Sequence, residues 1–419
     1  MRIHIRGGRV IDPATGRDAV ADVYTAEGKI AEEFGKPDRV IDAKGLVVAP
    51  GFIDLAARLR EPGFEYKATL ESELDAALAG GVTSLACPPD TDPPLDEPGL
   101  VDMLRRRAKA LSRARVYPIG ALTLKLQGEA LTEMGQLTDA GCVAFSQGNV
   151  PISDTQVLWR ALQYAATFGY RVWLRAEDAA LAKGGVAHDG EMATRLGLPG
   201  IPGFAETVAL GTLIELVRAT GARVHVCRLS TASAVELMRR AKAEKLPLTC
   251  DVAIHHLHLS DMDLGYFDSQ CRLEPPLRSQ RDRDALSRAA ADGVIDCLVS
   301  DHTPVDEDGK HLPFAEAEPG ATGLELLLPL ALKWGEAHKL ALAPTLARIT
   351  TEPARILGVE AGRIAFGAPA DLAIFDPRAP FQVSAQTLKS QGKNTPFLGY
   401  ELSGRVRFTL VAGNVVHEG

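Results

Sequence analysis

The chain of 419 residues lacks the features that mark several large classes of protein. No apolar run approaches the length of a membrane-spanning helix, and Met1 to Arg6 shows neither the apolar core nor the cleavage site of a signal peptide. No basic run suggests a nucleic-acid partner, and there is no acidic tail, although the formal net charge is −8. We therefore expect a cytoplasmic protein with no membrane or nucleic-acid partner.

Cysteine is also sparse, and its spacing excludes the common zinc and redox motifs. The six cysteines are widely scattered, and no two form a Cys-x-x-Cys pair. Most lie in apolar, strand-like segments such as the one that ends at Cys87. We expect buried, reduced thiols, which agrees with a cytoplasmic location.

The middle of the chain alternates short apolar strands with amphipathic helices. In the segment from 206 to 220, Leu210, Leu213 and Val217 recur at helical spacing, and Gly221 provides a stop. Ser230 or Thr231 is placed to cap the next helix. The predicted units are strand 171–174, helix 206–220, strand 223–227, a helix to about 242 and strand 248–252. Repeated β-α units of this kind predict an α/β fold, most simply a closed (β/α)8 TIM barrel.

The two ends of the chain differ from the middle, because they hold short β-like pieces broken by turns. Neither end is long enough to bury a core alone, so we expect both termini to form one small β-sandwich. The predicted division is residues 1–50 plus 356–419 for this unit and residues 51–355 for the barrel.

The segment from Gly51 to Gly63 resembles the metal-binding strand of the dihydroorotase family, of the amidohydrolase superfamily. In that family it reads Gly-Phe-Ile-Asp-x-His-x-His-x-Arg-x-Pro-Gly. Here the frame of Asp54 and Arg60-Glu61-Pro62-Gly63 is kept, but Ala56 and Arg58 stand at the two histidine positions. Alanine offers no donor atom, and arginine has no lone pair for a metal.

Further landmarks of the family follow in order along nearly the whole chain. The resemblance implies four histidines and two aspartates as zinc ligands on barrel strands. One carboxylate falls within Ser146-Gln147-Gly148-Asn149, where neither Gln147 nor Gly148 is an acid, and the last ligand is kept as Asp301. The ligand positions are replaced by Ala56, Arg58, Gly148, Arg175 and Arg228. One carboxylate beside three guanidiniums cannot hold zinc, so we predict no metal cofactor and no catalytic residue beyond a vestigial Asp301.

The substrate positions implied by the resemblance are altered as well. Arg60 matches the arginine that binds the substrate carboxylate, but Asp90 and Glu274 replace asparagines and Val305 replaces a histidine. An acid beside a carboxylate site is repulsive. We expect Arg175 and Arg228 to point into the barrel mouth and to pair with carboxylates such as Asp301 or Glu177. A relocated metal site could be sought among His255, His256, His258, Cys227 and Cys250, but their spacing matches no closed zinc motif.

The chain resembles the inactive dihydroorotase-like chains that assemble with aspartate carbamoyltransferase in some bacteria. It implies a structural subunit for de novo pyrimidine biosynthesis, with the carbamoyltransferase catalytic chain as partner and homo-oligomers expected. One alternative is an active dihydroorotase or related cyclic-amide hydrolase with an atypical site. Another is a sensor that binds an anion through Arg58, Arg60, Arg175 and Arg228.

Overall fold

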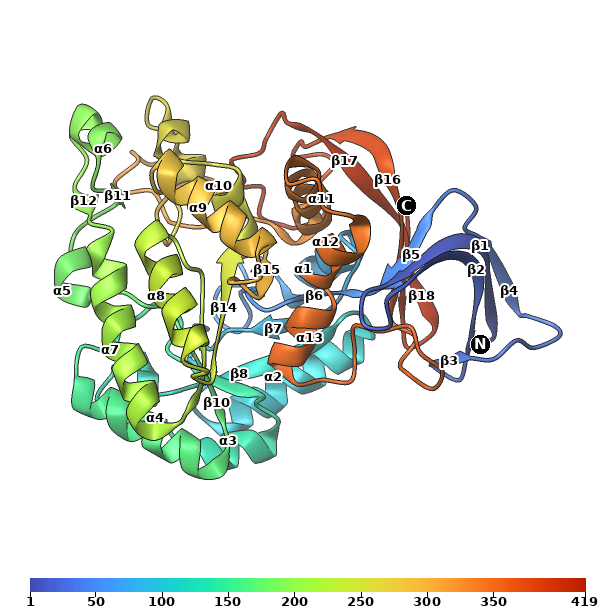
Figure 1. Ribbon diagram of the computed structural model, residues 1–419, viewed down its shortest axis with the longest axis horizontal. Helices are drawn as coiled ribbons and strands as arrows, with labels where there is room; N and C mark the ends of the chain where they lie inside the picture. The colour runs from blue at the N-terminus through green and yellow to red at the C-terminus, as the bar shows by residue number, and fades with distance from the viewer.

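A computed structural model describes all residues, 1–419, as a barrel with a β-sheet at one side. Figure 1 shows the barrel with its surrounding helices and, beside it, the sheet that contains both termini. The sequence predicts this architecture, and the structure confirms it.

The barrel consists of eight parallel strands in the spatial order β6-β7-β8-β9-β10-β13-β14-β15. Between the ends β6 and β15, the seam is held by Asp54, which accepts hydrogen bonds from the backbone N–H (3.1 Å) and the hydroxyl of Ser300. A short parallel bridge between Ala57 and His302 continues the seam. The strands are β6 (Phe52–Asp54), β7 (Val82–Cys87), β8 (Arg115–Ala121), β9 (Ala144–Ser146), β10 (Arg171–Leu174), β13 (Arg223–Val226), β14 (Leu248–Ala253) and β15 (Cys297–Val299).

The helices cover the outside of the barrel, and their ends follow local sequence signals. Helix α7 is stopped by Gly221, which follows its last residue and has φ +70°. The Thr231 hydroxyl caps α8 by accepting from the Ala234 N–H. The helices are α1 (Leu70–Ala79), α2 (Pro98–Leu111), α3 (Met134–Ala140), α4 (Thr155–Phe168), α5 (Ala179–Ala182), α6 (Glu191–Leu196), α7 (Phe204–Thr220), α8 (Ala232–Ala243), α9 (Gln280–Ala291), α10 (Glu307–His311), α11 (Leu327–Ala337), α12 (Leu342–Ala347) and α13 (Thr351–Leu357).

The two ends of the chain form one β unit with a separate apolar core, as the sequence predicts. The sheet branches at β1, which pairs with β2 on one side and with β4 and then β5 on the other. Its strands are β1 (Ile3–Asp12), β2 (Arg17–Ala26), β3 (Lys29–Ala31), β4 (Arg39–Asp42), β5 (Val47–Pro50), β16 (Leu372–Gln382), β17 (Glu401–Val411) and β18 (Asn414–Glu418). Two short strands, β11 (Ala187–His188) and β12 (Gly200–Ile201), pair separately.

The cysteine side chains lie mostly in the protein interior. All six cysteines are free thiols, and all but the partly buried Cys227 are buried, which confirms the expected burial for five of them. None of the helices combines the length and the apolar character needed to span a bilayer.

Candidate functional site: an arginine and carboxylate network at the barrel mouth

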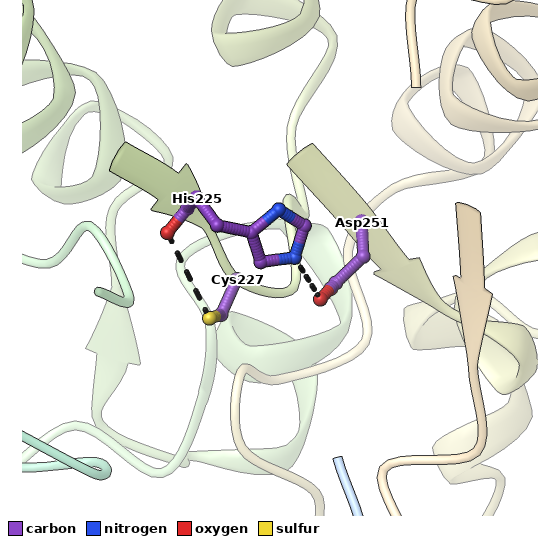
Figure 2. A group of neighbouring side chains, drawn as sticks. All are labelled: His225, Cys227 and Asp251. Carbon is purple, nitrogen blue, oxygen red and sulfur yellow. Dashed lines mark hydrogen bonds and ion pairs between the residues drawn. The ribbon is translucent and has the colours of Figure 1, made fainter. Parts of the chain in front are cut away.

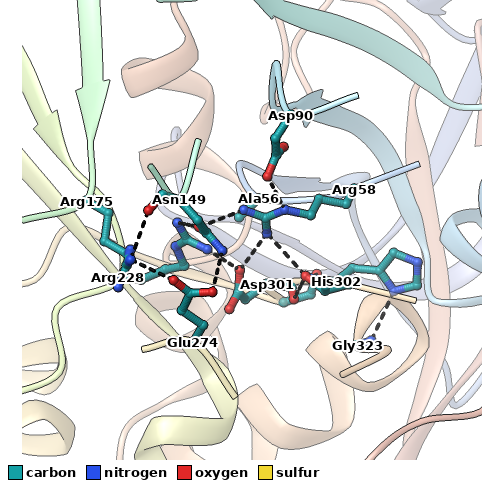
Figure 3. Close-up of polar contacts among 12 residues, drawn as sticks. Ala56, Arg58, Asp90, Asn149, Arg175, Arg228, Glu274, Asp301, His302 and Gly323 are labelled. Atoms are coloured by element: carbon teal, nitrogen blue, oxygen red, sulfur yellow. Dashed lines mark hydrogen bonds and ion pairs between the residues drawn. The ribbon is translucent and has the colours of Figure 1, made fainter. Parts of the chain in front are cut away.

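Three arginine side chains meet at the carboxyl end of the barrel, where enzymes of this fold carry their sites. Arg58 follows β6, Arg175 follows β10 and Arg228 follows β13, and each side chain is about 95% buried. Figure 3 shows the three guanidinium groups directed toward a common centre. Three buried cations this close together require anionic or carbonyl partners.

Asp301 lies between two of these arginines. Its Oδ1 accepts hydrogen bonds from Nη1 of Arg228 at 2.9 Å and from Nη1 of Arg58 at 3.3 Å. Nη1 of Arg58 also donates to Oγ1 of Thr303 at 3.1 Å. The predicted ion pair between Asp301 and the arginines is therefore confirmed, and the carboxylate has two cations as neighbours.

Asp90, Glu177 and Glu274 supply the remaining negative charge. Oδ2 of Asp90 accepts from Nε of Arg58 at 2.7 Å. Burial raises the pKa of Asp90, but the charge and hydrogen bond of Arg58 outweigh burial and hold that pKa below its usual value. Arg175 makes two bonds of 2.7 Å to the carboxylate of Glu177 and a third of 2.7 Å to Glu274.

These contacts change the interpretation of Asp90 and Glu274. From the sequence, both acids are repulsive groups in a substrate pocket. In the structure, each is the ion-pair partner of an arginine that stands at a predicted ligand position. The positive charges at the predicted ligand positions are thus balanced by negative charges at the predicted substrate positions, within one network.

Asn149 joins all three arginines, although no sequence motif marks it as a site residue. Its Oδ1 accepts from Nη2 of Arg58 at 2.9 Å and from Nη2 of Arg228 at 2.6 Å. Its backbone carbonyl accepts from Nη2 of Arg175 at 3.0 Å, and its Nδ2 donates to Glu274 at 3.2 Å. The loop after β9 is therefore fixed to the centre of the mouth.

Arg60 lies outside this network. Its Nε donates to the Pro304 carbonyl at 2.8 Å, and its guanidinium lies 5.9 Å from the centre of the Phe64 ring. Burial, together with the nearby charge of Arg58, lowers its pKa.

Val305 is buried, and its N–H donates to Asn394. The neighbouring His302 turns away from the mouth, since it pairs with Glu73 and accepts from the Gly323 N–H.

The residues at the predicted ligand positions do not fit a zinc ion. Ala56 and Gly148 have no donor atom, and the three guanidiniums have no lone pair. The one retained carboxylate, Asp301, is already paired with two cations. The cavity beside Ala56, Gly148 and Arg228 measures about 20 Å³, close to the space that a single water occupies.

One other group could supply metal ligands: His225, Cys227 and Asp251, whose ligand atoms lie within 4.8 Å of one another. Figure 2 shows the His225 ring directed toward Asp251. Nε2 of His225 contacts Asp251 at 2.8 Å, and Nδ1 contacts Oγ1 of Thr249 at 2.8 Å. The other oxygen of Asp251 accepts from the Arg228 N–H at 2.6 Å. Burial raises the pKa of Cys227, so its thiol stays protonated. Hydrogen bonds within the protein therefore explain why these three side chains lie close together.

The relocated metal site considered from the sequence is not assembled. His255, His256, His258 and Cys250 belong to no group of three potential ligands. His258 bonds to the Leu330 carbonyl, and the Cys250 thiol donates to the Val294 carbonyl. Of the five residues considered, Cys227 alone lies in a candidate group.

Comparisons with known proteins agree with this architecture. A family described as Dihydro-orotase-like matches residues 45–234, and the Amidohydrolase family matches residues 205–417. A Dihydroorotase-like protein of Pseudomonas aeruginosa is 46% identical over the full length of both chains, and a Dihydroorotase of Geobacter metallireducens is 40% identical over the full length of both. Among solved structures, an L-hydantoinase (dihydropyrimidinase) from Arthrobacter aurescens superimposes with a TM-score of 0.88. It is 25% identical, with 99% of this chain and 96% of that chain covered.

Proposed function

Because this chain belongs to the dihydroorotase-like family of amidohydrolases, we propose that it is a non-catalytic member that serves as an assembly subunit for aspartate carbamoyltransferase in pyrimidine biosynthesis. The proposal has two parts. The first is the loss of metal-dependent hydrolysis, and the second is the identity of the partner.

A single observation carries the first part: Arg58 and Arg228 both donate to Asp301, at the position where relatives of this type hold zinc. Metal-assisted hydrolysis needs several protein ligands and an open coordination position for water. Here the centre holds guanidinium groups, and the carboxylates beside them, Asp90 and Asp301, are already ion-paired with Arg58 and Arg228.

Support for the second part comes from the sequence resemblance and from the integrity of the scaffold. The barrel, its seam and the terminal sheet are all complete. A fold kept whole around a site that does not fit metal supports a binding role. The carbamoyltransferase catalytic chain is the partner that the resemblance implies.

Metal analysis with a hydrolysis assay tests the first part. We expect protein purified without chelator and then dialysed to contain far less than one zinc per chain and to show no dihydroorotate turnover. The Geobacter metallireducens relative, assayed in parallel, is the reference. One zinc per chain, retained through dialysis and accompanied by turnover, would disprove the proposal.

Reconstitution tests the second part. We expect the carbamoyltransferase catalytic chain to co-purify with this protein in equal stoichiometry. In a deletion strain we expect carbamoyltransferase assembly or activity to fall, and an unrelated active dihydroorotase should not rescue it. Normal assembly in the deletion strain would contradict the scaffold role.

A second candidate function is an active cyclic-amide hydrolase with an atypical site. The observation that favours it is the 40% identity to several chains named Dihydroorotase. The hydrolysis assay separates this candidate from the scaffold role, because turnover without stoichiometric zinc supports the atypical enzyme and contradicts a non-catalytic chain.

A further inference from the structure

A second hollow lies at the opposite, amino-terminal end of the barrel. It measures about 330 Å³ and is bounded by the first residues of β10, β13 and β14 and by α13. Ile356 and Leu357 of α13 belong to the same buried apolar cluster as Ile53 and Trp173, so this helix closes the base of the barrel beside the hollow. The mouth network described above lies at the other end of the same strands.

Two arginines at the rim have no anionic partner. Arg171 and Arg223 are register partners on the neighbouring parallel strands β10 and β13, so their side chains start from adjacent positions. Like charges placed directly opposite each other in a sheet are destabilising. Burial and the charge of Arg223 both lower the pKa of Arg171, and no carboxylate opposes them. Arg171 is therefore a half-buried cation whose charged neighbour is another cation, so its charge is not compensated.

A third arginine on the rim has its charge already compensated. Arg355 of α13 pairs with Glu352 at 2.9 Å and with Asp296 at 3.3 Å. Two uncompensated positive charges therefore remain at this hollow, in a chain whose net charge is −8. A monoanion would neutralise one of them, and a dianion would neutralise both.

Beyond the arginines, the lining of the hollow includes two aromatic rings and several apolar side chains. Trp173 and His225 lie two residues further along β10 and β13 than the two arginines, on the same face of the strands. Their ring centres are 5.2 Å apart. Both ring nitrogens of His225 are bonded within the protein, so the polar groups of the floor are already occupied. The apolar lining is completed by Leu246, Pro247, Leu248 and Ile356.

We propose that this hollow binds a phosphate monoester with a small planar or apolar body. The dianionic phosphate would lie between Arg171 and Arg223, whose planar forks match phosphate geometry. The organic body would rest against Trp173. Such an ester carries close to two negative charges at neutral pH, which equals the uncompensated charge of the rim.

Calorimetric titration of the full chain in phosphate-free buffer tests the proposal. The probes are phenyl phosphate, inorganic phosphate and benzoate. We expect phenyl phosphate to bind most tightly, Arg171→Gln and Arg223→Gln each to raise its Kd at least tenfold, and Arg378→Gln, an exposed site on β16, to leave it unchanged. Fluorescence of Trp173 should respond to phenyl phosphate, and this response should vanish in Trp173→Phe.

Thermal unfolding separates a binding role from a structural one. If the two arginines serve a ligand, then removing one in phosphate-free buffer relieves repulsion, so Arg223→Gln should raise Tm while losing the Tm increase produced by phenyl phosphate. Equal affinity of the wild type and both glutamine variants would overturn the proposal. Benzoate or inorganic phosphate binding as tightly as phenyl phosphate would overturn the assignment of a phosphate monoester.

Discussion

At the scale of single residues, arginine at a histidine position reverses the electrostatics of a metal site. A neutral histidine donates a lone pair to a cation, whereas arginine is itself a cation that must find acceptors. Arg58 finds them in Asp90 and Asp301, and Arg175 finds one in Glu274. The positive charge that a metal would supply is thus built into the side chains.

Asp301 is the residue whose loss this network should tolerate least. Asp301→Ala leaves the Nη1 groups of Arg58 and Arg228 without their shared carboxylate in a buried site. We expect the free energy of unfolding to fall by about 3–5 kcal/mol, the usual cost of removing one partner of a buried pair. Urea denaturation measures it. The exposed Asp308→Ala serves as control, and an equal, small effect of both substitutions would contradict the pairing.

Restoring one ligand should not restore catalysis. Ala56→His adds one imidazole beside Arg58, and the guanidinium still repels a metal cation. We expect neither bound zinc nor dihydroorotate turnover from this variant, as measured by elemental analysis and a hydrolysis assay. Even with all five ligand positions restored, we expect Asp90, Glu274 and Val305 to hinder substrate binding. Measurable turnover by the single variant would refute the prediction.

His256 should make stability depend on pH. Burial lowers its pKa to about 3, whereas an unfolded histidine titrates near 6.5. The unfolded chain therefore binds a proton that the folded chain refuses between these values, so stability falls as pH decreases through this window. His256→Gln keeps a donor for the Pro276 carbonyl and does not titrate. We expect it to reduce the loss of unfolding free energy between pH 7.5 and pH 5 by about 2 kcal/mol.

Denaturant titrations at the two pH values provide the measurement. His311→Gln, whose side chain is exposed, is the matched control and should leave the pH dependence unchanged. Identical pH profiles for His256→Gln and the wild type would show that this imidazole is not held neutral.

At the scale of elements, the loop after β9 depends on one side chain. Asn149 accepts from Arg58 and Arg228 and donates to Glu274. We expect Asn149→Ala to increase hydrogen exchange across residues 147–154 and to lower the unfolding free energy by about 1–3 kcal/mol, since buried donors lose their acceptor. Asn414→Ala, at an exposed position on β18, should change neither quantity. Unchanged exchange in the loop would show that other contacts fix it.

Elements governed by local signals could be predicted from the sequence. Strand 171–174 has the predicted bounds, the helix predicted from 206 ends at Thr220 as expected, and Thr231 is the cap of α8. These features depend on periodicity, a glycine stop and a hydroxyl, all of which act within a few residues. The two-residue strands β11 and β12 carry no such signal, because their pairing is set by the surrounding loops.

In the mouth network, the direction of some side chains could be predicted from the sequence, but their pairing could not. The inward direction of Arg175 and Arg228 followed from strand register and was confirmed. The pairing of Asp90 with Arg58 could not be deduced, since it joins loops after different strands and depends on side-chain reach. Asn149 was missed for a related reason: an amide that bridges cations looks like any loop asparagine in the sequence.

At the scale of the whole molecule, Asp371 connects the terminal sheet to the barrel. Its carboxylate accepts two bonds from Arg115 of β8, at 2.7 and 3.1 Å, and one from the Ala412 N–H at 2.7 Å. The hydrogen bond to Asp371 raises the pKa of Arg115. We expect Asp371→Ala to lower the unfolding free energy by about 1–3 kcal/mol and to separate the melting of sheet and barrel.

Differential scanning calorimetry distinguishes one transition from two. The exposed Glu401→Ala on β17 is the control and should keep the single transition of the wild type. A single unshifted transition in Asp371→Ala would show that the remaining contacts between the two units suffice.

The acceptors that the arginines of the mouth share also constrain which substitutions this site can accept during evolution. Exchanging Arg228 for a metal ligand, as in Arg228→His, leaves Asp301 and Asn149 short of a donor. Removing the charge of Asp90, as in Asp90→Asn, leaves Arg58 with less compensation. Each intermediate would lose several kcal/mol out of a total stability of about 5–15 kcal/mol. A lineage that has acquired this network therefore loses stability at each single step that removes one of its members, so a return to a metal site is favoured when several positions change together.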